Sequence, residues 1–277
     1  MTAKKIRWSR LDALGTIRTS GSDALAFLQG QLSNDVGLLS DTRAQLSSYN
    51  SPKGRMLAVL TLFRTGDTIQ LELHRSVLES VLKRLRMFVL RSKVTLDDIS
   101  AALPALGLWG DDASHVLSSL GLVCPAQALD VASHDSITVI RRLGESARYS
   151  LRGPAPAISK LETELAALSA PATEDEWKRA DIEAGVPTVY PQTQDHFVPQ
   201  WCNLHNLGGI SFTKGCYTGQ EIVARIHYLG EVKRRMQIFR LTACTGLIPG
   251  TQTEHGELVD SVALPEGGCL NLIVQRV

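Results

Sequence analysis

The sequence predicts an α+β protein with partly antiparallel sheets, followed by a small β-barrel or sheet. The chain has 277 residues, a length that fits about two domains or three small ones. Short strand-like segments with irregular, partly antiparallel connections are interspersed with helices, which favours α+β over a doubly wound sheet. After residue 230, strand-like segments follow one another between Gly/Pro turns with no helical period. These observations together predict the fold class.

The first third of the chain predicts one sheet with two helices. Strand-like segments cover 13–19, 42–49, 55–63 and 68–73. The second and third of these flank Asn50-Ser51-Pro52-Lys53-Gly54, which is typical of a hairpin turn. A short helix is expected at 22–28, and a longer one at 76–90. The longer helix is supported by Ser76 and Glu79, which have the spacing of a capping box.

The pattern in the middle of the chain predicts a second set of strands and helices, and the pattern in the last part predicts the barrel. Strands are expected at 106–109, 137–143 and 147–151, and helices at 112–120, 157–168 and 173–185. Thr173 and Glu176 again have capping-box spacing. Strands at 232–242, 257–264 and 270–277 would form the barrel. We therefore expect an α+β region within 1–230 and a minimal barrel at 231–277.

Composition excludes several classes of protein. Hydrophobic residues make up 44% of the chain and charged residues 21%, as in a cored globular protein. The net charge of +1 gives no general attraction to nucleic acid or anionic membrane, so we expect neither membrane association nor direct nucleic-acid binding. Short basic clusters such as Lys233–Arg235 leave local RNA contact open. The sequence contains neither the glycine-rich dinucleotide motif nor the P-loop motif.

The five cysteines indicate a cytoplasmic protein with free thiols. Their number is odd, there is no C-x-x-C motif, and no apolar segment resembles a secretory signal. Cys202-x-x-His205 has the form of half a metal site, but no second half stands at ligand spacing. We therefore expect no metal site there.

Cys216 is the candidate reactive residue. Thr218 and Glu221 have capping-box spacing, which predicts a helix beginning at Thr218, two residues after Cys216. The positive end of a helix favours a thiolate, and Lys214 and Arg225 would add positive charge. We take Cys216 and Lys214 as the candidate catalytic residues. A buried structural cysteine is the alternative.

The segment Lys214-Gly215-Cys216-Tyr217-Thr218-Gly219-Gln220-Glu221 resembles the signature of the YgfZ family of folate-binding proteins. This family is related to the T protein, the aminomethyltransferase of the glycine cleavage system. Further segments that resemble the family lie at 27–36, 53–56, 181–187, 197–200 and 208–212. The resemblance thus extends from about residue 14 to the end of the chain.

The resemblance implies a ring-like architecture of two α+β lobes with mainly antiparallel sheets and a small C-terminal β-barrel, with tetrahydrofolate in a central channel. The two lobes, interleaved within 1–230, would then form the folate-binding region. Trp177 stands where the family places an aromatic residue that contacts the pterin, while Leu14 stands where the family has a second tryptophan. Glu183 lies on the same expected helix and has the chemistry to accept hydrogen bonds from the pterin. The remaining candidate folate-binding residues are Tyr217, Gln220 and Arg225.

The function implied is a tetrahydrofolate-binding protein that supports iron–sulfur cluster assembly or maintenance. Its partners would be iron–sulfur proteins, among them the radical enzymes that modify tRNA. The alternative is a folate-dependent aminomethyltransferase, and a third possibility is a module that only senses folate. True aminomethyltransferases carry an acid just after the hairpin turn, whereas residues 53–59 contain no carboxylate. This difference favours an accessory factor over a transferase.

Overall fold

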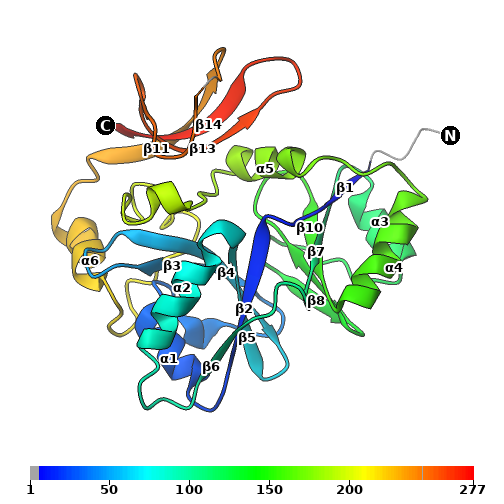
Figure 1. The fold of residues 1–277 in the computed structure, drawn as a ribbon, viewed down its shortest axis with the longest axis horizontal. Helices are drawn as coiled ribbons and strands as arrows, with labels where there is room; N and C mark the ends of the chain where they lie inside the picture. Colours follow the sequence, from blue (N-terminus) through cyan, green and yellow to red (C-terminus); the bar gives the residue numbers. More distant parts are fainter. Residues whose placement is uncertain (1–5, 245) are drawn as a thin grey trace.

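The computed structural model describes residues 6–244 and 246–277, which form three antiparallel sheets (Figure 1). The first sheet has the strand order β3-β4-β5-β2-β6. Its strands are β2 (Leu14–Ser20), β3 (Gln45–Asn50), β4 (Met56–Thr65), β5 (Thr68–His74) and β6 (Thr95–Asp98). Helices α1 (Ala24–Gln31) and α2 (Arg75–Met87) pack on this sheet and share its apolar core. Together they form the first lobe.

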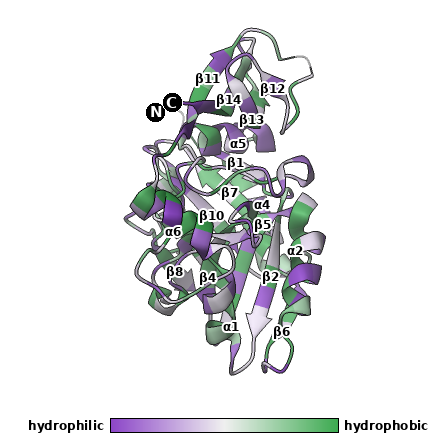
Figure 2. Cartoon of the chain, turned by 90° about the vertical axis from the view of Figure 1, so that its left-hand side faces the viewer, coloured by the Kyte–Doolittle hydropathy of each residue, from purple (hydrophilic) through white to green (hydrophobic). Residues whose placement is uncertain are grey.

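The second lobe is built on a sheet with the order β1-β7-β10-β9-β8. Its strands are β1 (Arg7–Arg10), β7 (Ala105–Trp109), β8 (Val131–His134), β9 (Ile137–Arg141) and β10 (Arg148–Arg152). Helices α3 (Ala113–Ser119) and α4 (Ala155–Ala166) pack against this sheet. Figure 2 shows that β4 of the first lobe and β7 of the second are largely hydrophobic, as buried strands must be. Because β1 belongs to the second sheet and β2 to the first, the two lobes are interleaved.

The C-terminal part is a four-stranded half-barrel with the order β11-β14-β13-β12. Its strands are β11 (Arg234–Leu241), β12 (Gln252–Thr253), β13 (Gly256–Ala263) and β14 (Cys269–Arg276). Helix α5 (Glu174–Glu183) lies between the half-barrel and the second lobe, and α6 (Gln220–Leu229) lies at the left edge in Figure 1. Within the described residues, no helix is long and apolar enough to cross a membrane.

The predicted fold class is confirmed, and the differences concern short strands and helix starts. Strands β1, β6, β8 and β12 were not expected, since each has four residues or fewer. The cap of α2 is His74, whose Nδ1 accepts a hydrogen bond from the Ser76 amide, so the predicted cap at Ser76 is wrong. Thr173 does precede α5, but Glu176 forms no capping box because its carboxylate pairs with Arg7.

A buried ion cluster joins the two lobes. Glu72 on β5 accepts hydrogen bonds from Arg142 (2.7 Å) and from Nε of Arg152 on β10 (2.7 Å). Arg152 also donates to the Thr16 hydroxyl of β2 at 3.0 Å. Burial alone would raise the pKa of Glu72, but the two guanidinium groups outweigh burial and hold this pKa below its usual value. One buried carboxylate therefore links side chains of both sheets.

Candidate functional site

Lys214 ties the loop before α6 to the end of α1. Its Nζ donates to the backbone carbonyls of Gln29 (2.7 Å), Leu32 (2.7 Å) and Asn34 (2.8 Å). The side chain is buried, and burial lowers the pKa of Lys214 to about 8 against the opposing effect of Asp35. Because all three ammonium protons are donated to the backbone, this geometry favours a positioning role over the predicted catalytic one.

The start of α6 is set by a contact between two glycines. Gly219 has φ +81°, and a Cβ there would lie 2.4 Å from the Ser51 carbonyl oxygen and 2.8 Å from the Cα of Gly54. The hairpin turn between β3 and β4 is therefore packed directly on the first turn of α6. The helix begins at Gln220 with no side-chain cap, so the prediction that it begins at Thr218 is wrong.

Cys216 is exposed on the loop that these contacts hold. It lies four residues before Gln220, so it is farther from the helix end than expected, and the helix field falls off within the first turn. A Cβ on the neighbouring Gly215 would meet no atom within 4 Å, so the loop stands in open space. The other four cysteines are buried or half-buried. The thiol is thus accessible, which excludes the alternative of a buried structural cysteine.

The other predicted residues of this segment surround the same loop. Tyr217 is buried, and the Lys214 ammonium lies 5.1 Å from its ring centroid. Burial raises the pKa of Tyr217 to about 12, which keeps its hydroxyl protonated. Gln220 is half-buried at the first position of α6, and Arg225 is exposed on the same helix.

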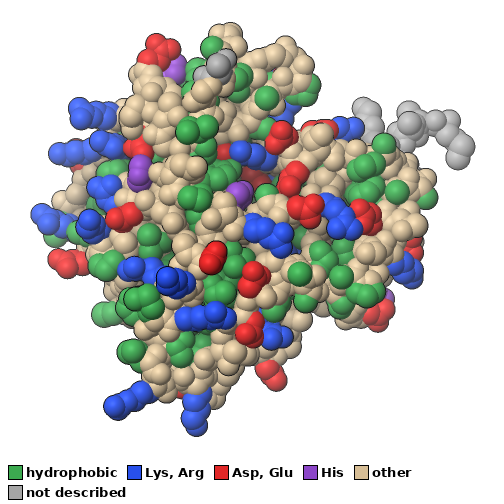
Figure 3. Space-filling view, viewed as in Figure 1, with side chains coloured by type: hydrophobic (Ala, Val, Ile, Leu, Met, Phe, Trp, Pro, Cys, Tyr) green, Lys and Arg blue, Asp and Glu red, His purple; other side chains and the backbone are tan. Residues whose placement is uncertain are grey.

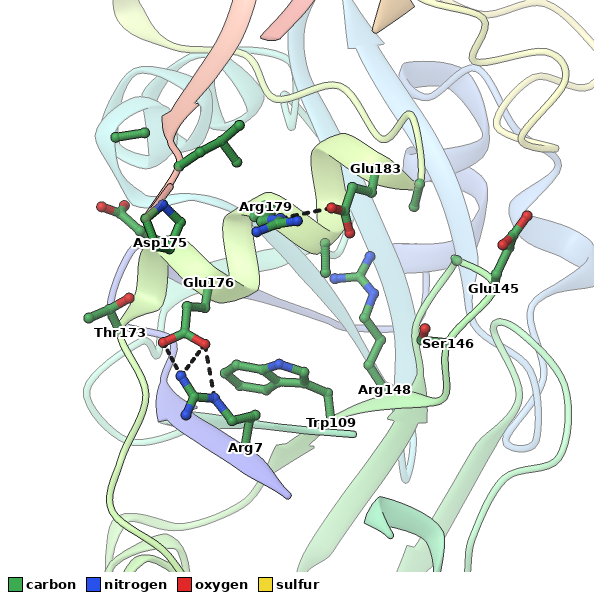
Figure 4. A pocket seen from close by; sticks show the side chains of 16 residues that line it. Arg7, Trp109, Glu145, Ser146, Arg148, Thr173, Asp175, Glu176, Arg179 and Glu183 are labelled. Atoms are coloured by element: carbon green, nitrogen blue, oxygen red, sulfur yellow. Dashed lines mark hydrogen bonds and ion pairs between the residues drawn. The ribbon is translucent and has the colours of Figure 1, made fainter. Parts of the chain in front are cut away.

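A separate cavity of about 1130 Å³ lies beside α5 (Figure 4). Its walls come from α5, from β7 and β10, from the turn between β9 and β10, and from the turn between β13 and β14. Half of the residues that line it are charged or aromatic: Arg7, Trp109, Glu145, Arg148, Asp175, Glu176, Arg179 and Glu183. A concave site with a few convergent polar groups is the usual form of a small-molecule site.

Arg148 gives this cavity an unsatisfied donor. Its Nη2 donates to the Leu143 carbonyl at 2.8 Å and to the Asp181 carboxylate at 2.6 Å, and the side chain is 2% exposed. Within the described residues, its Nη1 is buried and has no hydrogen-bond partner. An unpaired buried donor is costly, so this guanidinium is suited to an acceptor atom of a ligand.

Trp109, not Trp177, forms the aromatic wall of the cavity. Trp177 is a residue of α5, is 3% exposed and packs on Gly107 of β7. A Cβ on Gly107 would lie 2.6 Å from the Trp177 ring, so only glycine leaves room for the ring there. Trp109 packs edge-on against Trp177 at 5.6 Å between ring centroids, and Arg148 lies 5.0 Å from the Trp177 ring centroid. Trp177 therefore packs against the side of Trp109 that faces away from the cavity and helps to hold the Trp109 ring in place.

The structure divides the predicted folate residues between two places. Glu183 lines the cavity, where its carboxylate accepts from Arg179 at 2.8 Å. Tyr217, Gln220 and Arg225 are absent from its lining and belong to the α6 region, at the left edge of Figure 1. The five predicted folate-binding residues therefore do not all line this cavity. Sequence reasoning missed Trp109 and Arg148, which lie on neighbouring strands and adjoin only after the sheet has formed.

Cys202 and His205 do not form a metal centre in the described structure. Cys202 is fully buried in the core, and burial raises the pKa of its thiol. His205 is half-buried, and burial together with nearby Arg235 and His227 lowers its pKa. Among residues 6–244 and 246–277, no three His, Cys, Asp or Glu side chains gather as metal ligands would.

Comparison with known proteins identifies the family, although no protein-family model matches the chain. A protein of Hamiltonella defensa named tRNA-modifying protein YgfZ is 34% identical over 239 residues, covering 84% of this chain and 70% of the relative. The protein of the same name from Photorhabdus laumondii is 35% identical over 227 residues, covering 82% and 68%. The chain belongs to the YgfZ family.

A solved structure agrees with this assignment. The glycine cleavage system aminomethyltransferase T from Bartonella henselae aligns with 99% of this YgfZ-family chain and 79% of its own, with a TM-score of 0.75 and 14% identity. At this identity the likeness shows a shared fold. Three of the segments that resemble the family meet in space, because 29–34, 51–54 and 214–219 lie around the Cys216 loop.

Proposed function

We propose that this YgfZ-family protein binds tetrahydrofolate in the α5 cavity and supports iron–sulfur cluster assembly or maintenance in the cytoplasm. Through cluster-dependent enzymes it would support tRNA modification, the activity in the names of its curated relatives. The observation that carries the folate part is the pairing of the Trp109 wall with the unsatisfied Nη1 of Arg148.

The donor set of the cavity fits a reduced folate. A pterin ring offers a flat face for Trp109, N–H donors for Glu183 and a carbonyl acceptor for Arg148. Trp177 and Asp181 hold this set in place, Trp177 from behind Trp109 and Asp181 through its bond to Arg148. The cavity therefore has the residues to bind and orient the cofactor.

Cys216 supplies the proposed link to iron and sulfur. A thiolate is the soft ligand that iron and sulfide chemistry uses, and the loop presents this thiol to solvent, where a partner protein can reach it. Because Cys216 lies outside the cavity lining, the proposal gives folate and thiol separate places on the molecule.

Replacing Trp109 with alanine is expected to weaken tetrahydrofolate binding. Loss of a stacking surface costs about 1–3 kcal/mol per base-sized ring, roughly 5- to 150-fold in affinity. Anaerobic titration calorimetry with tetrahydrofolate measures the change. Trp201→Ala is the matched control, since Trp201 is another half-buried tryptophan but packs with Arg55 and Arg234 away from the cavity. Unchanged affinity in a folded Trp109→Ala variant would remove Trp109 from the site.

We also expect no aminomethyltransferase turnover. Residues 53–59 carry no acid, and the carboxylate that does reach this turn, Asp195, accepts a hydrogen bond from the Ser51 hydroxyl at 2.5 Å and so helps to hold the turn. The turn therefore has no free acid at the place where true aminomethyltransferases carry one for proton transfer. The check is methylene-tetrahydrofolate formation from an aminomethyl-loaded carrier protein; robust turnover would establish the transferase alternative.

A further inference from the structure

The charges of this chain are segregated although they nearly cancel overall. Residues 213–240 contain six Lys and Arg against two Glu, a surplus of four positive charges. Residues 154–183 contain three Lys and Arg against seven Asp and Glu, a surplus of four negative charges. Figure 3 shows Lys and Arg gathered along the left edge, where Figure 1 places α6. The net charge of +1 therefore hides a local positive surface.

Four basic side chains in this region are exposed and free of carboxylates. Lys53, Arg225, Lys233 and Arg235 make no ion pair within the described residues, and the neighbouring acids Glu221 and Glu231 make none either. These four positions lie on α6, on the turn packed against its start, and just after its end. Gly54 packs on Gly219, which places Lys53 beside the start of α6, and β11 follows α6 directly.

An exposed aromatic platform lies among these charges. Phe212 stacks on His227 with 3.6 Å between ring centroids and 9° between planes. Tyr228 packs edge-on against His227 at 4.7 Å, and its hydroxyl donates to the Phe212 carbonyl at 3.2 Å. Tyr228 is nevertheless 63% exposed. It lies three residues after Arg225, so the two side chains share one face of the helix.

We propose that this surface, the α6 face formed by Lys53, Phe212, Arg225, His227, Tyr228, Lys233 and Arg235, binds single-stranded or loop RNA. Unpaired lysines and arginines contact phosphates, while an exposed ring fixed by its neighbours stacks on an unpaired base. An acidic protein would contact only the basic side chains of this face. The aromatic platform has a use when the partner is RNA, because a base can stack on it, and this favours RNA. The exposed Cys216 lies on the loop that joins Phe212 to α6. RNA on this face would therefore lie beside the thiol.

The test is equilibrium binding of a fluorescent single-stranded RNA of mixed sequence, about 15 nucleotides long, to the full chain over a salt series. Arg225→Gln combined with Arg235→Gln is expected to weaken binding and to flatten the slope of log K against log salt by about 1.4, that is about 0.7 for each phosphate that the variant no longer neutralises. Lys160→Gln is the control, because Lys160 is exposed on α4 of the acidic segment and should leave both quantities unchanged.

The aromatic contribution is measured separately. Tyr228→Ala is expected to weaken RNA binding by about 5- to 150-fold with the salt slope unchanged, whereas Tyr228→Phe keeps the stacking surface and should bind as wild type does. Circular dichroism and thermal unfolding verify that each variant is folded. Absence of RNA binding by the wild-type chain overturns the proposal. So does equal binding by the double-arginine variant and the Lys160 control, or polyglutamate competing as well as RNA of equal charge. None of these results bears on folate binding in the α5 cavity.

Discussion

Replacing Cys216 with serine is expected to abolish function while leaving the fold intact. Serine keeps the shape of the side chain but lacks the soft sulfur that binds iron or carries sulfur. The residue is exposed and the loop is fixed by Lys214 instead, so the free energy of unfolding should change by no more than about 0.5 kcal/mol. The measurement is complementation of a deletion strain, read out as the level of tRNA thiomodification.

The matched control is Cys202→Ala. Cys202 is fully buried in the core, and alanine avoids placing a hydroxyl there without a partner. This variant should complement normally. If Cys216→Ser complements as well as wild type and Cys202→Ala does not, the functional thiol has been assigned to the wrong cysteine.

Replacing Glu72 with glutamine is expected to give the largest loss of stability. The change leaves Arg142 and Arg152 buried between the lobes without a counter-charge, and breaking a buried pair in this way costs about 3–5 kcal/mol. Urea denaturation measures it as a fall in the midpoint concentration. Asp97→Asn is the control: its ion pair with Arg18 is exposed, so it should cost about 1 kcal/mol or less.

The same cluster makes a prediction about pH. The pKa of Glu72 is lowered in the folded state, so at acidic pH this residue binds more protons in the unfolded chain than in the folded one, and its contribution to stability rises with pH. The advantage of wild type over Glu72→Gln should be complete above the unfolded pKa of about 4.3 and should shrink as the pH falls through the folded value. A difference that grew on acidification would contradict this account of the cluster.

The sequence contains enough information for most of the fold but not for the helix starts. Apolar periodicity locates α2, α4 and the long strands, because a buried face repeats every two or 3.6 residues. The capping-box rule fails at α6 because tertiary contact decides there: Gly219 adopts φ +81° against the hairpin turn, a contact with residues far away in sequence. The rule fails at α2 because the helix already begins at Arg75, where Nδ1 of His74 accepts a hydrogen bond from the Ser76 amide.

The candidate site shows the same limit. Spacing and the resemblance to the family selected Cys216, and Glu183 was selected because it shares a helix with Trp177. Neither argument separates the loop before α6 from the cavity beside α5. Trp109 and Arg148 are opposite partners in the β7–β10 ladder, and nothing in either local sequence marks them as neighbours. Pairing across a sheet brings such residues together, and a single sequence does not display that pairing.

Hydrogen–deuterium exchange with and without tetrahydrofolate tests directly whether folate binds in the α5 cavity, since ligand contact slows the opening of the backbone around a site. We expect protection in the segments that wall the cavity, 105–111, 143–149 and 173–184, and unchanged exchange across 212–229. Protection of 212–229 with none at 173–184 would place folate at the Cys216 loop and would contradict the division of the site into a cofactor cavity and a separate thiol.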